Sequence, residues 1–79
     1  MYYVYLIRRI NNKIYIGYTN DLKRRIYEHR EKKPDLIYYE AYKNKLDAQN
    51  REKKLKQRGY AIRWLKNRIQ HSLNKKKII

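Results

Sequence analysis

Residues 2–19 read YYVYLIRRINNKIYIGYT, two runs of β-branched and aromatic residues on either side of Asn11-Asn12. Such runs favour strands, and paired asparagines favour turns. The segment therefore predicts a β-hairpin with strands over Tyr2–Arg8 and Ile14–Thr19. Its register is critical, because a slip of one residue moves every side chain to the opposite face of the sheet.

The length of the connection determines how the hairpin sorts its side chains. A connection with an odd number of residues gathers the aliphatic side chains on one face: Val4, Leu6, Ile14 and Ile16, together with Tyr18. The other face then carries the remaining tyrosines and a glycine: Tyr3, Tyr5, Tyr15 and Gly17. A two-residue Asn-Asn turn would instead put Tyr5 and Tyr15 on opposite faces. We favour the odd connection because its aliphatic face can form a core.

The rest of the chain predicts one more strand and three helices. A cap at one of residues 19–21 starts a helix that ends near Glu31, and a third strand covers Leu36–Tyr42. A second helix runs from a weak capping box at Asn44 to Gly59, and a third covers Tyr60–Leu73.

These elements predict an α+β fold. Its order is ββαβαα, with a small three-stranded antiparallel sheet flanked by helices. At 79 residues the chain has room for a single domain, expected over residues 1–73, followed by a basic, frayed tail over residues 74–79.

The composition points to an anionic partner. Lys and Arg number 22 against 7 Asp and Glu, which gives a formal net charge of +15. Nucleic acid is the commonest partner of a small basic domain, so we expect DNA, or else RNA. The longest apolar run, Met1–Ile7, is too short to cross a bilayer, and the chain has no cysteine. We expect a cytoplasmic protein without a membrane span, and the sequence leaves its oligomeric state open.

The C-terminal third should carry most of the positive potential, because no carboxylate follows Glu52. Its basic residues are the expected nucleic-acid contacts: Lys53, Lys56, Arg58, Arg63, Lys66 and Arg68. Each phosphate that such a residue neutralises releases a counterion, which gives affinity that falls steeply with salt. In a chain of ordinary charge they would be read as solvated helix faces.

Three polar residues fall on helix faces that should turn inward. Arg25 and His29 share a face with Leu22 and Ile26, and Glu52 lies between Ala48 and Leu55. Each has a structural explanation, in which Arg25 pairs with a carboxylate, His29 packs, and Glu52 forms a salt bridge with Lys56. Together with tyrosines they also meet the needs of phosphodiester cleavage, which are a base, a cation and a metal ligand.

The chain resembles the GIY-YIG nuclease family, in particular its small stand-alone bacterial members. The resemblance rests on Tyr3-Val4-Tyr5, on Tyr15-Ile16-Gly17, and on Arg25, His29 and Glu52 in that order. The stretches YYVYLI (2–7), YIGYTNDL (15–22), LIYYEAY (36–42) and REK (51–53) extend it over nearly the whole chain.

The resemblance implies which residues form the active site. Tyr5 and Tyr15 would be catalytic tyrosines, Gly17 would keep the site open, and Arg25 and His29 would position the phosphate. Glu52 would hold one divalent ion, Mg²⁺ or alternatively Mn²⁺, with waters and a phosphate oxygen completing its shell. Either tyrosine could be the general base, and our preference at this point is Tyr5.

Two features depart from the family pattern. Tyr3 stands where the family name has glycine, and the connection from His29 to Leu36 is shorter than the Gly- and Ser-containing loop of the small members. The leading hypothesis is a metal-dependent endonuclease that cleaves DNA with low intrinsic sequence specificity. The alternative is a non-catalytic nucleic-acid-binding module that retains the nuclease fold, and a binder of membrane surfaces or acidic proteins ranks last.

Overall fold

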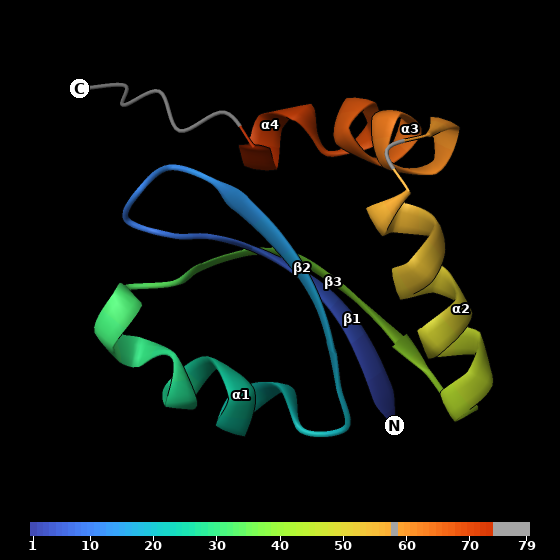
Figure 1. Cartoon of the computed structure of the whole chain (residues 1–79), viewed down its shortest axis with the longest axis horizontal. Helices are drawn as coiled ribbons and strands as arrows, with labels where there is room; N and C mark the ends of the chain where they lie inside the picture. The colour runs from blue at the N-terminus through green and yellow to red at the C-terminus, as the bar shows by residue number, and fades with distance from the viewer. Residues whose placement is uncertain (58, 74–79) are drawn as a thin grey trace.

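The computed structural model describes residues 1–57 and 59–73. Its strands are β1 (Tyr2–Arg8), β2 (Ile14–Thr19) and β3 (Asp35–Tyr42). Its helices are α1 (Leu22–Glu28), the 3-10 helix η1 (Arg30–Lys32), α2 (Lys45–Lys56), α3 (Tyr60–Arg68) and α4 (Gln70–Leu73). The strands form one antiparallel sheet in the order β2-β1-β3, which confirms the α+β class. In Figure 1, α1 lies on one side of this sheet and α2, α3 and α4 lie on the other.

The hairpin joins β1 to β2 through Arg9–Lys13, an odd number of residues. Asn12 has a left-handed backbone conformation with φ 67°, which asparagine tolerates better than most residues. Its N–H donates to the Arg9 carbonyl at 2.7 Å. Val4 pairs with Tyr18 and Tyr5 with Gly17, so the expected register is confirmed.

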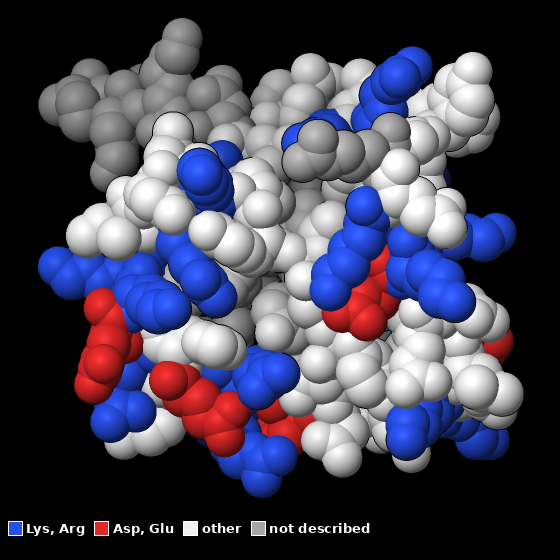
Figure 2. All heavy atoms as spheres, in the orientation of Figure 1, with Lys and Arg blue, Asp and Glu red and all other residues white. Residues whose placement is uncertain are grey.

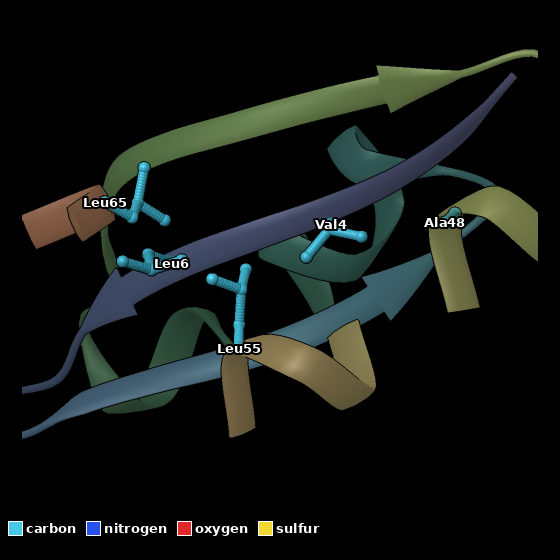
Figure 3. Close-up of a cluster of buried hydrophobic side chains, with 5 residues drawn as sticks. All are labelled: Val4, Leu6, Ala48, Leu55 and Leu65. Atoms are coloured by element: carbon cyan, nitrogen blue, oxygen red, sulfur yellow. The ribbon is translucent and has the colours of Figure 1, made fainter. Parts of the chain in front are cut away.

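The aliphatic face of the hairpin forms the core with α2 and α3. Figure 3 shows the buried side chains that meet there: Val4, Leu6, Ala48, Leu55 and Leu65. Burying a valine or leucine contributes about 1.5–3 kcal/mol, so these contacts hold both helices against the sheet. None of the described helices is long and apolar enough to cross a membrane.

The first helix is shorter than expected. It stops at Glu28 instead of Glu31, and the separate turn η1 follows. The backbone is then left-handed at Lys33, with φ 49°, directly before Pro34. Proline disfavours the right-handed helical region for the residue before it, so the helical run cannot continue. Strand β3 starts one residue earlier than expected.

The single helix expected over Tyr60–Leu73 is wrong, because the helix breaks at Ile69. The backbone there has φ −107° and ψ 29°, and the Ile69 side chain packs against the core. The short helix α4 follows, and the Arg8 side chain on β1 donates a hydrogen bond to the Leu73 carbonyl. This bond pairs one of the carbonyls that a helix end leaves free. The tail expected over residues 74–79 lies outside the described residues.

A polar cluster on β3 faces the same side of the sheet as the core. Glu40 pairs with Val4 across the strands and meets Arg51 of α2. The Glu40 carboxylate accepts hydrogen bonds from the Tyr38 hydroxyl at 2.6 Å, from the Tyr42 hydroxyl, and from the Arg51 guanidinium at 2.9–3.2 Å. We call these four residues the Glu40 network, which the sequence analysis did not anticipate.

The Glu40 network fixes the protonation of its members. Burial by itself raises the pKa of Glu40, but the hydrogen bonds from Arg51, Tyr38 and Tyr42 outweigh burial and hold this pKa below its usual value. Burial, followed by the hydrogen bond to Glu40, raises the pKa of Tyr38 and of Tyr42 to about 12. At neutral pH the carboxylate is therefore charged and both phenols are protonated.

Candidate active site

The Tyr5 side chain lies across Gly17, its partner on β2. Tyr5 is only 5% exposed, and a Cβ added to Gly17 would stand 2.2 Å from the Tyr5 hydroxyl oxygen. Any side chain at this position would therefore displace the phenol. Gly17 serves here by leaving space and not by its backbone freedom, because its φ is not positive.

Helix α1 brings a cation to the Tyr5 side chain. The Asp21 side chain begins this helix by accepting a hydrogen bond from the Arg24 N–H at 3.1 Å. Interactions with Tyr5, and after it with Glu28, raise the pKa of Arg25, which keeps the guanidinium charged. The distance from the Arg25 Nη1 to the Glu28 carboxylate is 3.5 Å. The structure thus places Arg25 beside Tyr5.

Tyr15 lies on the same face of the hairpin, two pairs closer to its turn. Its hydroxyl accepts a hydrogen bond from the Asn11 side-chain amide at 3.3 Å, and the Arg9 guanidinium lies 4.0 Å above its ring. The hydrogen bond from Asn11 lowers the pKa of Tyr15 against an opposing effect of burial, and the charges of Arg9 and Lys13 lower this pKa further. The surroundings of Tyr15 therefore favour its phenolate.

Glu52 lies on α2 and forms a weak ion pair with Lys56. Its carboxylate lies 3.1 Å from the Lys56 Nζ, one turn further along α2, as the structural explanation predicted. The two side chains are 23% and 55% exposed, and ion pairs with this spacing on a helix contribute only about 0.3–0.5 kcal/mol. The ion pair therefore leaves the carboxylate able to exchange Lys56 for another cation.

Side chains of β1, β2, α1 and α2 meet around one pocket of about 310 Å³, which we call the tyrosine pocket. Its lining includes every residue that the sequence analysis placed in the site: Tyr5, Tyr15, Gly17, Arg25, His29 and Glu52. His29 is half-buried at the C-terminal end of α1. Ligand pockets span about 300–1,000 Å³, so the tyrosine pocket has room for a group the size of a phosphodiester.

The tyrosine pocket offers a divalent ion one carboxylate. Among residues 1–57 and 59–73, no three His, Cys, Asp or Glu side chains are grouped so that they could hold a metal ion. Mg²⁺ usually keeps several waters and binds through one or two carboxylates plus substrate phosphates. Glu52 fits this mode, in which the ion and the phosphate bind together, and does not fit a complete protein cage.

Sequence reasoning missed one cation of the pocket. Arg9 lines it beside Tyr15, and the buried Arg9 Nε has no hydrogen-bond partner within the described part of the chain. A buried donor without a partner is costly. The sequence did show that Arg9 directly follows the strand that carries Tyr3-Val4-Tyr5. It did not show that the hairpin loop folds the Arg9 side chain back over Tyr15.

The cations expected to bind nucleic acid do not all lie together. Lys56, Arg63 and Lys66 line an open groove of about 680 Å³ beside the tyrosine pocket, which we call the basic groove. Arg68 lines a separate hollow with Trp64, and Lys53 is exposed on α2. Arg58 lies outside the described residues. Figure 2 shows basic side chains spread over much of one face of the molecule, with the acidic ones confined to a few places.

Comparisons with known proteins agree with this geometry. Residues 1–35 match the family model described as the GIY-YIG catalytic domain, a segment that includes the two tyrosines, Arg25 and His29 but not Glu52. The chain is also 37% identical over 62 residues to the UPF0213 protein of Clostridium perfringens, with 66% of this chain and 67% of that protein covered. No solved structure matches the chain significantly. With both tyrosine motifs on one face of the hairpin, these matches show that the chain belongs to the GIY-YIG family.

Proposed function

We propose that this protein is a divalent-metal-dependent endonuclease that hydrolyses DNA phosphodiester bonds. Membership in a nuclease-type family supports the reaction class. The observation that carries the proposal is the tyrosine pocket of about 310 Å³, whose lining brings together Tyr5, Tyr15, Arg9, Arg25, His29 and Glu52. A base, cations for the phosphate and a ligand for a metal ion are the groups that this hydrolysis needs.

Each group has a role that follows from its surroundings. Arg25 and Arg9 would bind the non-bridging phosphate oxygens, and His29 would orient the phosphate. Glu52 would hold the divalent ion, which supplies Lewis-acid polarisation of the phosphate when bound. We assign the general base to Tyr15, whose pKa is lowered, while Tyr5 lies against Gly17 and Arg25. This assignment reverses the preference for Tyr5 that the sequence alone suggested.

Low intrinsic sequence specificity follows from the kind of contacts available. The basic side chains of the tyrosine pocket and of the basic groove suit phosphates, and phosphate contacts position a protein without reading bases. A domain of 79 residues also has little further surface for base-edge contacts.

Nicking of supercoiled plasmid with and without Mg²⁺ tests the proposal. Wild type should nick only with the metal. Glu52→Gln should be slower by at least about 100-fold, since a metal ligand of this kind is worth several kcal/mol in the transition state. Asp47→Asn is the matched control, because it removes one negative charge from the exposed face of the same helix and should leave nicking unchanged.

The binding-only alternative gives the opposite result. In that case wild type and Glu52→Gln would both bind plasmid, with an affinity that falls steeply as the salt concentration rises. Neither protein would nick the plasmid with Mg²⁺ or Mn²⁺. Metal-dependent nicking that survives Glu52→Gln would instead contradict the role of this carboxylate.

The pH dependence of nicking tests the role of Tyr15. If the Tyr15 phenolate is the base, the rate rises with pH through a midpoint below the ordinary pKa of tyrosine. Asn11→Ala removes the hydrogen bond that contributes most to the lowered pKa, so the midpoint should move to higher pH. Lys13→Gln, which removes a smaller contribution, should move it less in the same direction.

The control for this profile is Asn50→Ala, an exposed asparagine on α2. Its midpoint should equal that of wild type. A midpoint that stays constant in Asn11→Ala and Lys13→Gln, with the folded far-UV spectrum retained, would assign the base to another group.

A further inference from the structure

Two large aromatic side chains stand uncovered on α3. Tyr60 is 71% exposed and Trp64 is 72% exposed, one helical turn apart. Their ring centroids are 6.3 Å apart with an interplanar angle of 62°, so the rings support each other edge to face. Core packing does not use them, because the inward face of α3 is formed by Ala61, Ile62 and Leu65. Exposed aromatic groups of this size mark an interaction surface.

The helix that carries this aromatic pair is basic. Helix α3 carries Arg63, Lys66 and Arg68, and its sequence has no Asp or Glu. The Arg63 guanidinium lies 5.3 Å from the centroid of the Tyr60 ring, and Arg68 lines a hollow of about 430 Å³ together with Trp64. Aromatic faces interleaved with arginine suit a ligand that offers both rings and negative charge.

The basic groove links this helix to the tyrosine pocket. Tyr15, Ile16 and Lys56 line both the pocket and the groove, so the two spaces are direct neighbours. Along the groove the lining passes to Arg63 and Lys66 of α3. Arg63, which lines the groove, also contacts the Tyr60 ring, so a strand that passes from Tyr15 along Lys56 to Arg63 comes up to the aromatic pair.

We infer that Tyr60 and Trp64 form a stacking platform for unpaired bases of a DNA strand that leaves the tyrosine pocket through the basic groove. This inference rests on the proposed nuclease function and specifies its substrate, which is DNA with a single-stranded segment beside the cleaved bond. Bases in a continuous duplex cover each other's faces, whereas an unpaired base offers a free face to an aromatic side chain. The groove supplies the cations that the backbone of the strand needs.

The fluorescence of Trp64 reports directly on this contact, because it is the only tryptophan of the chain. The experiment uses the full chain with Glu52→Gln, so that binding is measured without cleavage, and titrates it with a short oligothymidylate or with a blunt duplex of the same length. The oligothymidylate should quench the fluorescence to saturation, and the duplex should quench it far less. Polarisation of a labelled oligothymidylate then measures the affinity of variants that lack Trp64.

Trp64→Ala should weaken binding of the oligothymidylate by about 5-fold or more, because stacking on an aromatic side chain is worth at least about 1 kcal/mol per base. Trp64→Phe should keep most of the affinity, since it keeps a ring. The matched control is Tyr27→Ala on α1, where Tyr27 is 63% exposed with the Arg30 guanidinium 4.0 Å above its ring. It should bind like the parent protein.

Two results would overturn the inference: fluorescence that does not change with the oligothymidylate, or equal quenching by the duplex. If Trp64→Ala and Tyr27→Ala weakened binding of the oligothymidylate equally, the inference would also be contradicted, because the loss of affinity would not be specific to the aromatic pair on α3. Its failure is distinct from failure of the nuclease proposal. If wild type nicks plasmid but the oligothymidylate does not quench Trp64 fluorescence, only the platform is contradicted. If the oligothymidylate quenches the fluorescence but wild type does not nick plasmid, the platform is supported and only the nuclease proposal is contradicted.

Discussion

Replacing Glu40 with alanine should lower the free energy of unfolding by about 2 kcal/mol, which is within the usual cost of leaving the hydrogen-bond partners of a half-buried group unsatisfied. The variant leaves Arg51 without its carboxylate and leaves the Tyr38 and Tyr42 hydroxyls without their acceptor. Domains are stable by roughly 0.05–0.15 kcal/mol per residue, so this loss is a large part of the total. Urea unfolding followed by circular dichroism measures it.

Two further variants make the measurement specific to the Glu40 network. Glu31→Ala removes an exposed carboxylate of η1 and should change stability by less than about 0.5 kcal/mol. Glu40→Gln keeps an acceptor for the phenols and should cost less than Glu40→Ala. If Glu40→Ala were as stable as Glu31→Ala, the network would contribute nothing to folding.

Acid should weaken wild type through the same carboxylate. Its pKa is lower in the folded chain than in the unfolded one, so as the pH falls through this range the unfolded state takes up the proton first. The contribution of Glu40 is present above its unfolded pKa and is lost as the pH falls toward its folded pKa. Glu40→Gln should therefore lose less stability than wild type between neutral pH and about pH 3.

Replacing Gly17 with alanine should reduce the rate of plasmid nicking by about 100-fold, since displacement of catalytic groups by about 1 Å can cost this much. The added Cβ would stand 2.2 Å from the Tyr5 hydroxyl oxygen and 2.3 Å from the ring carbon that bears it. Tyr5 is buried, so its ring must shift away from Gly17, which changes its contact with Arg25 and the wall of the tyrosine pocket.

The second glycine of the chain gives the control for this experiment. A Cβ added to Gly59 meets nothing within 4 Å, and the backbone φ there is −105°. Gly59→Ala should therefore nick plasmid at the wild-type rate. Equal rates for Gly17→Ala and wild type would show that turnover does not depend on the position of the Tyr5 phenol.

The sequence predicted what depends on local periodicity. Alternation along residues 2–19 was enough to separate Val4 and Leu6 from Tyr5 and Tyr15, because one register alone buries the aliphatic side chains together. The spacing on α1 predicted that Arg25 turns toward the sheet, and the structure places it there beside Tyr5. The family resemblance predicted that the remaining pocket residues lie together, and they line one pocket in the structure.

The features that sequence reasoning missed depend on contacts between distant segments. Glu40 lies on the core face of β3 because of its pairing with β1, and its partner Arg51 follows eleven positions later on another element. No local pattern distinguishes this glutamate from a solvated one. The break at Ile69 likewise coincides with a contact between Arg8 and Leu73, at opposite ends of the described chain.

The central place of β1 in the sheet bears on how this protein is made. During synthesis β1 can pair with β2 before the later segments exist, but its other edge must wait for β3, and its aliphatic face must wait longer still for Leu55 and Leu65. Until then, the nascent hairpin exposes its apolar face and the unpaired backbone edge of β1, both of which favour aggregation. The core can therefore close only after α3 has been synthesised, because Leu65 of this helix packs on the aliphatic face of the hairpin.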